Sequence, residues 1–569
     1  MGGVRSTSTL FLMLVIFLLT IPYSIFSPSN TESLTACASS PLSFSENNII
    51  ITDAQFYDCA QELALFHQAE GLSSLVINTS WIYTQYPAAE DPPIKGYGQG
   101  ILSKLFINKQ YNYVLAKKII SFLRDQTMHP ALEYVTLFGD GRYLPASYYM
   151  YSQLRNSIPF VANIMLPDFY NNRIASDFFY CSPDYDFEPD FKVGRIPVSN
   201  TDEAALYVEK VQRWRAQVNW SWFQNVFVAG DQPDLPEEMD LDGCYAGEMI
   251  AVDAINQGYF QGMNVTKLFL TENTFTKLAI ENVMNAGQAG FLYVMAHGSV
   301  DRWATYDEPD PFVYGDDLLQ FSENNQIPIV VSVACMSGAF DTTIAHPYWI
   351  ARGQASLGES ILFSPGAGVA YVGTTRATLG SPLLRLEDGE LNITKERGIA
   401  GMLTYFFEAY HQNITMLGDL TYAAINRYIM ENDFPEAPEK DEAFVVLMSF
   451  VLLGDPALRL PSPQLDACPS YEQPRLDALG FEGLTSEANP RPWYYTNTPV
   501  QIMITTNSSD VTVKRINIDT DQVVDRENLT LLNNSGTYSF VSSEPARYLI
   551  RVSSLDGKEG WLYLTTRQS

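Results

Sequence analysis

The sequence predicts an α/β protein with parallel sheets and helices on both faces, followed by a C-terminal all-β domain. Two observations support the α/β part: short apolar runs alternate with amphipathic helical segments, and this order occurs twice along the chain. A third observation is a change of periodicity, because apolar and polar residues alternate from about residue 488, as in VQIMIT and ARYLIRV. This alternation predicts a β-sandwich of roughly Ig size.

The composition is that of a large, acidic, globular protein. Its 569 residues are too many for one hydrophobic core, and 46% hydrophobic and 18% charged residues are ordinary values for folded domains. The formal net charge of −30 argues against nucleic-acid binding, because phosphate groups require a basic surface. The acidity fits cation-binding loops or an acidic pocket, or simply a surface that keeps an exported protein soluble.

Residues 1–36 are interpreted as an export signal or an N-terminal anchor. Arg5 precedes an apolar run from about Leu10 to Phe26, which is short for a membrane-spanning helix. The residues LTAC at 34–37 resemble a bacterial lipobox, in which Cys37 would be lipidated, although the apolar run ends several residues earlier. We therefore expect an exported protein, extracellular or at the cell surface, and membrane attachment through this segment or through Cys37 stays open.

The first α/β unit is predicted over residues 37–220. Short apolar runs predict its strands, at 48–52, 75–78, 134–140 and 191–199. Amphipathic segments predict helices between and after them, at 54–69, 114–126 and 201–217. Such alternation implies a parallel sheet with right-handed crossovers.

The second α/β unit is predicted over residues 221–465 and repeats the pattern. Its strands are expected at 225–231, 265–271, 291–295, 327–334 and 368–378. Its helices are expected at 245–257, 276–287, 355–361, 396–410, 416–431 and 441–450. A linker over 466–487 then leads to the β-sandwich over 488–569.

Two strands of the second unit end in residues that carry chemistry. His297 follows the run 291–295, and Cys335 follows the run 327–334. Because neighbouring parallel strands end at the same edge of a sheet, we expect an imidazole and a thiol to face each other there. Each residue taken alone favours a structural interpretation, Cys335 as a core thiol and His297 as a histidine at a strand end. Their occurrence together favours nucleophilic catalysis.

The pairing is chemically useful because a free thiol, with a pKa of about 8.5, is a weak nucleophile near neutral pH. A histidine within hydrogen-bond reach removes its proton. Small residues follow each group, Gly298 after the histidine and Ser337-Gly338 after the cysteine, and these leave space for a substrate carbonyl. The backbone N–H groups of Gly298 and Cys335 are candidates to bind the oxyanion that forms.

Several short motifs occur in a characteristic order over residues 48–460. They are Gly139-Asp140 followed by Pro145, Ser176-Asp177, Pro189-Asp190 ahead of Gly194-Arg195-Ile196-Pro197, His297-Gly298-Ser299 with Trp303, Ala334-Cys335 before Ser337-Gly338, Gly373 with Arg376, and Leu453-Gly454-Asp455-Pro456. In this order the chain resembles the gingipain-like family of cysteine peptidases, which belongs to the clan of caspases and legumains. The resemblance implies a caspase-like fold followed by an Ig-like domain.

The same resemblance implies roles for individual residues. Cys335 would attack the peptide carbonyl, and His297 would act as base and then as acid toward the leaving amine. Asp190 maps by position to the acidic residue that orients the histidine, with a turn residue as the alternative. Trp303 maps to an aromatic residue near the specificity pocket, with loop packing as the alternative.

Charged residues elsewhere suggest further ligands. Asp202 and Glu203 would place negative charge in the pocket and select arginine or lysine in the substrate. No cofactor is required for catalysis, but relatives bind structural calcium, for which the acidic loops 184–190, 231–242 and 307–317 offer oxygen ligands. Solvated acidic loops are the alternative, and no metal ligand is assigned.

The six cysteines are widely spaced, without a CxxC pair, which excludes a zinc ribbon and a dense disulfide framework. One or two disulfide bridges stay open.

The predicted function is an exported cysteine endopeptidase that acts on protein or peptide substrates through a Cys–His dyad and a thioester. Two alternatives stay open. One is a sortase-like transpeptidase on the same fold, which would accept an amine in place of water. The other is a catalytically silent surface binding or adhesion protein, since fold alone does not determine function.

Overall fold

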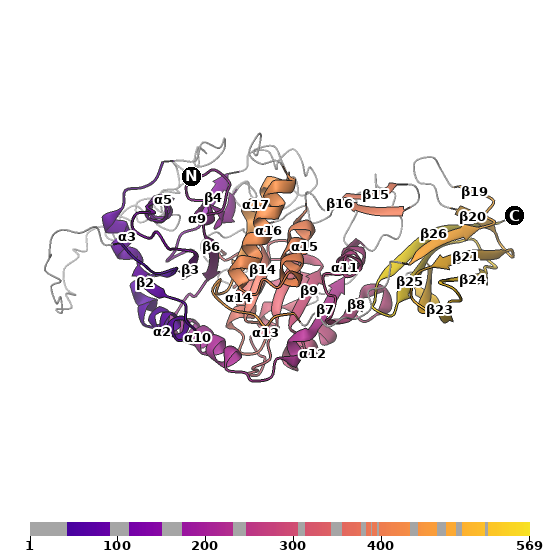
Figure 1. Cartoon of the computed structure of the whole chain (residues 1–569), viewed down its shortest axis with the longest axis horizontal. Coiled ribbons are helices and arrows are strands. Elements are labelled where there is room, and N and C mark those ends of the chain that lie inside the picture. Colours follow the sequence, from indigo (N-terminus) through magenta and orange to yellow (C-terminus); the bar gives the residue numbers. More distant parts are fainter. Residues whose placement is uncertain are drawn as a thin grey trace, which may run out of the picture. The chain divides into compact units, whose positions relative to one another are not determined.

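One ten-stranded sheet carries the α/β part of the chain, in the order β2-β1-β3-β6-β17-β14-β13-β9-β7-β8 (Figure 1). Its strands are β1 (Asn48–Thr52), β2 (Ser74–Asn78), β3 (Tyr134–Phe138), β6 (Lys192–Ile196), β7 (Asn225–Gly230), β8 (Asn264–Phe269), β9 (Phe291–Met295), β13 (Ile329–Val333), β14 (Ala370–Thr374) and β17 (Phe450–Leu453). Within each half, β2 to β6 and β14 to β8, all strands are parallel. The predicted pair of parallel-sheet units is confirmed, and the two units share a single sheet.

This computed structural model describes residues 43–90, 113–150, 173–230, 246–304, 313–342, 355–376, 383–387, 390–394, 398–432, 442–463, 474–484, 492–517 and 522–568. The predicted export signal and Cys37 lie outside these residues. Within the ranges given, no helix combines the length and the apolar character needed to span a bilayer.

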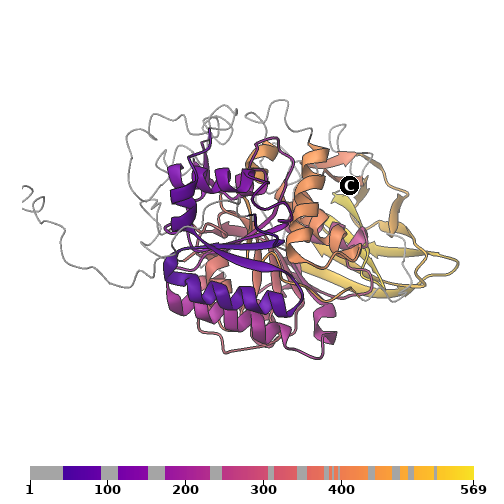
Figure 2. The ribbon, with the colours of Figure 1, turned by 60° about the vertical axis from the view of Figure 1, so that its left-hand side comes forward.

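Helices cover both faces of the sheet (Figures 1 and 2). They are α2 (Tyr57–Ala69), α3 (Thr79–Gln85), α5 (Tyr113–Arg124), α9 (Phe178–Cys181), α10 (Thr201–Arg215), α11 (Ala246–Asn256), α12 (Lys277–Asn285), α13 (Gly315–Leu318), α14 (Leu357–Phe363), α15 (Ile399–His411), α16 (Leu417–Glu431) and α17 (Glu442–Ser449). Tyr293 of β9 packs against Phe407 of α15, with ring centroids 4.9 Å apart and the ring planes tilted by 59°. Tyr371 of β14 points to the opposite face and lies against Gly358 at the start of α14. Strands β1, β9 and β13 are buried throughout. Because helices cover both faces of such strands, their sequences are continuous apolar runs without alternation.

The sequence prediction missed some elements of this region. The predicted helix 441–450 ends at Ser449, and Phe450–Leu453 form β17, which runs antiparallel to β14. Three small sheets were also not predicted: β4 (Ser147–Met150) with β5 (Arg173–Ser176), β10 (His297–Ser299) with β11 (Arg302–Ala304) and β12 (Val313–Tyr314), and β15 (Leu383–Glu387) with β16 (Glu390–Thr394). These strands are too short to produce a periodic pattern in the sequence.

The two halves of the sheet meet where two of the sequence motifs pack against each other. A Cβ atom on Gly194 would lie 2.6 Å from the carbonyl oxygen of Gly454 and 2.8 Å from Cδ of Pro456. Residues with side chains do not fit at such distances, so the Gly-Arg-Ile-Pro and Leu-Gly-Asp-Pro motifs need glycine for close backbone contact. Both motifs therefore have a structural role at this seam.

Arg195, the next residue, is completely buried and reaches from the first half toward the second. Its guanidinium forms two 2.7 Å hydrogen bonds with the carboxylate of Asp177. It also donates to the carbonyls of Gly139 and Leu144 and lies 4.2 Å from the ring centroid of Phe340. A buried charge with four hydrogen bonds of this kind joins three motifs to the segment after Cys335.

A second buried pair joins α2 to the end of β17. Nε2 of His67 lies 2.8 Å from Oδ2 of Asp455, and both side chains are almost fully buried. Burial by itself would lower the pKa of His67, but the Asp455 carboxylate outweighs burial and raises the pKa above its usual value. The folded protein therefore favours the imidazolium form.

We expect the stability to fall as the pH rises through the raised pKa of His67. A histidine whose pKa is higher in the folded state stabilises the protein fully below its unfolded pKa of about 6.5, and this contribution disappears above the folded pKa. Melting temperatures measured from about pH 5.5 to about pH 8.5 should decline in the wild type and vary less in His67→Gln. The same slope in both proteins would contradict this assignment.

The side chain of Lys210, on α10, caps the C-terminal end of α14. Its ammonium group donates to the carbonyls of Ile361, Leu362, Ser364 and Gly368. The last carbonyls of a helix have no partner within the helix and carry partial negative charge, so a cation is favourable there. Burial, and then the nearby Arg213, lower the pKa of Lys210 well below its ordinary value.

The C-terminal region is a β-sandwich, as predicted. One sheet has the order β18-β21-β24 and the other β19-β20-β26-β25-β22-β23. Their strands are β18 (Arg475–Leu479), β19 (Gly483–Leu484), β20 (Pro492–Tyr495), β21 (Pro499–Thr505), β22 (Asp510–Asn517), β23 (Gln522–Thr530), β24 (Ser535–Val541), β25 (Ala546–Ser554) and β26 (Glu559–Arg567). Strands β18 and β19 fall within the predicted linker 466–487, so the sandwich begins earlier than expected.

A network of buried charges connects the sandwich with the second half of the sheet. Arg551 of β25 lies 2.8 Å from Glu248 of α11 and 3.4 Å from Glu559 of β26. Lys267 of β8 pairs with Glu559, and Lys514 of β22 pairs with Glu272. Burial would raise the pKa of Glu559, but Lys267 and Arg551 hold it at about 2. Three cations thus neutralise three carboxylates.

Because these charges are buried, removal of one partner should be costly. We expect Arg551→Met to lower the free energy of unfolding by about 3–5 kcal/mol, since Glu248 and Glu559 would lose their shared cation. Arg475→Met is a matched control, because Arg475 is exposed and its one ion pair among the described residues is with Asp477 of its own strand. Chemical denaturation of both variants tests this difference, and equal stability would contradict it.

Candidate active site

The register of β9 against β13 sets the positions of His297 and Cys335. The two strands are parallel, and Met295 pairs with Val333. The backbone N–H of Ala296 continues the pairing with a 3.2 Å hydrogen bond to the carbonyl of Val333. His297 and Cys335 each follow the paired residues by two positions, so they stand level with each other at one edge of the sheet.

Gly298 brings the two segments into backbone contact. A Cβ atom at this position would lie 2.5 Å from the carbonyl oxygen of Cys335 and 2.9 Å from its amide nitrogen. Only glycine permits this approach. His297, Gly298 and Cys335 are all partly exposed, so a substrate can reach them. The structure therefore places Gly298 against the backbone of Cys335, with His297 as the residue directly before this contact.

The segment after Cys335 is held by the end of β14. Met336 adopts a left-handed conformation with φ of 57°, which is uncommon for a residue with a side chain. Its N–H donates to the carbonyl of Arg376 at 3.2 Å, and the N–H of Gly338 donates to the carbonyl of Thr374 at 2.8 Å. Such a conformation persists only when its surroundings fix it, and it is typical of functional sites.

A buried ion pair completes this support. The guanidinium of Arg376 donates to both oxygens of Asp341, at 2.9 and 2.6 Å. Both side chains are buried. Arg376 follows β14 and Asp341 follows the Cys335 turn, so the pair joins the ends of two neighbouring strands. Sequence analysis noted Arg376 only as part of a motif and did not identify Asp341.

Trp303 lies in the core. Its strand β11 pairs with β10, so that Trp303 stands opposite Gly298. The side chain is completely buried, and its indole N–H donates to Oγ of Ser332 at 3.0 Å. An aromatic side chain with its polar tip satisfied inside the protein supports the strand below the site. This burial favours the packing alternative, and a place near the specificity pocket stays a prediction.

Asp190 lies among other carboxylates of the first half. It lies in the acidic segment before β6, its side chain is exposed, and its backbone N–H donates to the carbonyl of Cys181 at 2.7 Å. Partial desolvation, followed by the neighbouring carboxylates of Asp184, Asp186 and Glu188, raises its pKa to about 6. Among the described residues, no hydrogen bond or ion pair connects Asp190 with His297. The structure thus favours the alternative of a turn residue.

Asp202 and Glu203 lie in the first turn of α10. Oδ1 of Asn200 accepts hydrogen bonds from the N–H groups of both residues, and Oε2 of Glu203 accepts one from the N–H of Ser199. Carboxylates in the first turn of a helix complement its dipole. The predicted role in a substrate pocket is replaced by helix capping.

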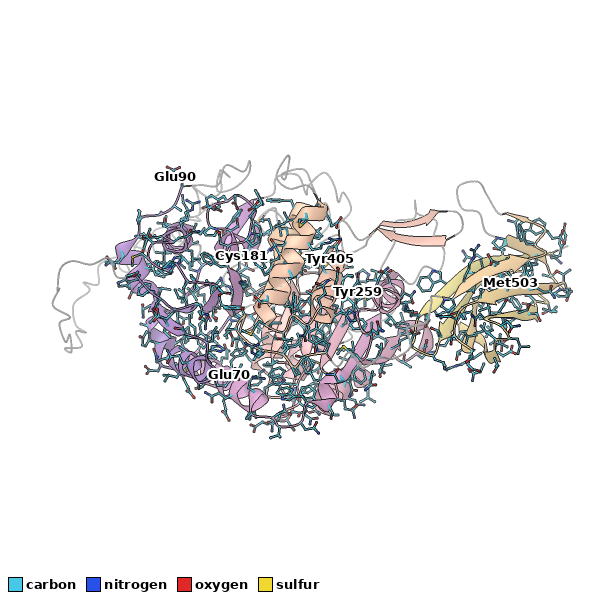
Figure 3. All side chains as sticks on the ribbon, in the orientation of Figure 1. Glu70, Glu90, Cys181, Tyr259, Tyr405 and Met503 are labelled. Atoms are coloured by element: carbon cyan, nitrogen blue, oxygen red, sulfur yellow. The ribbon has the colours of Figure 1, made fainter. Side chains whose placement is uncertain are left out.

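The described cysteines Cys59, Cys181 and Cys335 form no disulfide bond with one another. Cys181, labelled in Figure 3, is buried, whereas Cys59 is partly exposed, and burial followed by Glu62 and Asp58 raises the pKa of Cys59. Within the described ranges, no three His, Cys, Asp or Glu residues gather in a way that would hold a metal ion. Of the loops suggested for calcium, residues 231–242 and most of 307–317 lie outside those ranges.

Comparison with known proteins defines the class of this fold. The complex of the pro- and mature domains of RgpB from Porphyromonas gingivalis aligns with a TM-score of 0.50 and 12% identity, covering 92% of this chain and 100% of that one. The Arg-specific cysteine proteinase gingipain R aligns with a TM-score of 0.49 and 14% identity, covering 93% of this chain and 100% of that one. The first of these alignments shows that the chain shares the fold of the RgpB structure.

A sequence comparison establishes the family. The model of Peptidase family C25 matches residues 43–461, so the chain belongs to this family and is a cysteine-type peptidase. An uncharacterized protein of Archaeoglobus fulgidus is 27% identical over 407 residues, which cover 70% of this chain and 91% of that protein. The resemblance inferred from the motifs is confirmed.

The close contact at Gly298 gives a test of the site geometry. In Gly298→Ala the new Cβ would overlap the backbone of Cys335, so His297 and Cys335 would move apart. We expect peptidase activity to fall about a hundredfold and stability to fall by only about 1–3 kcal/mol. Activity assays and thermal denaturation measure the two effects separately. Full activity in a folded variant would contradict the inferred contact.

Proposed function

We propose that this peptidase is an exported cysteine endopeptidase in which Cys335 is the nucleophile and His297 the general base. The observation that carries the proposal is the register of β9 and β13 together with the contact of Gly298 against Cys335. Both groups stand level at one edge of the sheet on rigid strands, which is the arrangement that nucleophilic catalysis requires.

The reaction would proceed in two steps. His297 takes the thiol proton, and the Cys335 sulfur attacks the peptide carbonyl to form a tetrahedral oxyanion. As the C–N bond breaks, His297 gives its proton to the leaving amine, and a thioester remains on Cys335. His297 then removes a proton from water, the hydroxide oxygen attacks the thioester, and the thiol returns with release of the acid.

The oxyanion would be bound by backbone N–H groups of Gly298 and Cys335. These two residues are neighbours across the β9–β13 edge, where the chain allows no side chain on residue 298. Preorganised donors of this kind are each worth about 2.7–4 kcal/mol in measured enzymes. The acyl group would then lie over the same small residues.

Export is part of the proposal and rests on the N-terminal sequence. Arg5 followed by an apolar run has the composition of an export signal. Fractionation of cells that produce the full chain, with determination of the N-terminal residue of the mature protein, tests it. Recovery of uncleaved protein inside the cell would contradict export.

Loss of the nucleophile should remove activity while the fold stays intact. In the full chain we expect Cys335→Ala to show no peptide hydrolysis and no labelling by acyloxymethyl-ketone probes, and His297→Ala to lose labelling by at least about a hundredfold. Cys59→Ala is a matched control, because Cys59 is another partly exposed free thiol and should not affect labelling. Peptide mapping of the labelled site checks each case.

If no probe labels Cys335 in the wild type, the proposed mechanism is wrong, and a binding role becomes the better explanation. Probes with arginine, lysine, aspartate, asparagine or a hydrophobic residue should be compared. The one that reacts fastest defines the substrate residue that the pocket prefers.

A further inference from the structure

A chain of buried hydroxyl groups runs beneath the Cys335 turn. The indole N–H of Trp303 donates to Oγ of Ser332 at 3.0 Å, and Tyr371 lies on the neighbouring strand β14. The phenol oxygen of Tyr371 lies 2.6 Å from Oγ of Ser337, whose hydroxyl donates to the carbonyl of Ala334 at 3.0 Å. All four side chains are completely buried.

The direction of these hydrogen bonds is determined at the Ala334 end. A carbonyl oxygen can only accept, and the Ser337 hydroxyl has one proton, which it donates to Ala334. Ser337 must therefore accept its second hydrogen bond from the phenol of Tyr371. Hydrogen bonds aligned in this way strengthen one another in a low-dielectric interior. The result is an ordered connection between β14 and the Cys335 turn.

The phenol of Tyr371 is suited to this position. Burial raises its pKa to about 12, with Ser332 and Ser337 acting in the opposite direction, so the group stays protonated and can donate. Gly373 makes room for the ring, because a Cβ atom there would lie 2.6 Å from the phenol oxygen. Glycine at position 373 is therefore needed to leave space for the phenol of Tyr371.

The connection ends on the peptide that contains the nucleophile's N–H. The carbonyl of Ala334 accepts hydrogen bonds from Ser337 and, at 3.2 Å, from Oγ1 of Thr374. A trans peptide is planar, and its C=O and N–H point in opposite directions. Two hydroxyl groups that hold the Ala334 oxygen thus also set the direction of the Cys335 N–H.

We propose that Tyr371 is a positioning residue that, through Ser337 and the Ala334 carbonyl, aims the Cys335 N–H at the oxyanion. This inference rests on the proposed function, in which that N–H binds the oxyanion. Tyr371 itself touches no substrate. Its contribution is to keep the Ala334–Cys335 peptide plane in one orientation during both steps.

The experiment compares Tyr371→Phe with Tyr410→Phe in the full chain. Tyr410 is a matched control, since it is buried and its hydroxyl donates to a backbone carbonyl, that of Pro461, at 2.8 Å. In Tyr371→Phe we expect kcat to fall about tenfold to a hundredfold, less than removal of an oxyanion donor itself, with KM changed less than about twofold. In Tyr410→Phe both values should match the wild type.

The rate at which iodoacetamide alkylates Cys335 distinguishes two explanations for a lower kcat in Tyr371→Phe: a misdirected Cys335 N–H, or general damage to the site. This reaction forms no oxyanion, so its rate in Tyr371→Phe should stay within about twofold of the wild type. Ser337→Ala should lower kcat similarly, and the double variant should be little worse than either single one. If Tyr371→Phe folds poorly, Thr374→Val gives the same measurement, because it removes the other hydrogen bond to Ala334.

Three results would overturn the inference. An active wild type with unchanged kcat in Tyr371→Phe would overturn it alone and leave the proposed function standing. Equal losses of kcat and of alkylation rate in Tyr371→Phe would assign Tyr371 a general structural role. A wild type whose Cys335 is alkylated but which cleaves no peptide would overturn both proposals.

Discussion

The parallel alignment of β9 with β13 determines where His297 and Cys335, the proposed catalytic residues, stand. Successive residues of a strand point to opposite faces, so a shift of one residue would place His297 and Cys335 on different sides. Three features hold the alignment: complete burial of both strands, the extra hydrogen bond from Ala296 to Val333, and the glycine contact at Gly298. The geometry of the proposed site therefore depends first on the register of the sheet.

The same sheet explains why residues far from the thiol matter. Strand β17 lies between the two halves, and Gly194, Gly454 and Arg195 join them without a gap. Arg195 also contacts Phe340, five residues after Cys335. At the other end, the sandwich reaches Glu248 of α11, the helix packed against the end of β7. Both flanking regions thus contact the half of the sheet that contains β9 and β13.

Much of this could be predicted from sequence, and the limits have physical reasons. Buried strands such as 291–295 and 327–334 are visible as apolar runs, and the residues at their ends follow from the topology. Asp190, Trp303, Asp202 and Glu203 were placed by analogy or by charge, and neither reveals which direction a side chain takes. Tyr371 and Ser332 gave no signal, because a buried hydroxyl resembles any other strand residue until its distant partner is known. Strand β17 was missed because an apolar run fits a helix equally well.

Lys210 shows how the chain stabilises a helix end near this site. Its ammonium group sits among four carbonyls, an environment that other proteins give to a bound potassium or sodium ion. Here the cation is tethered to α10 by its own side chain and cannot dissociate. The turn between α14 and β14, and with it the strand that supports the Cys335 segment, therefore needs no dissolved ion at this point. It should remain ordered in dilute buffer and in the presence of chelators alike.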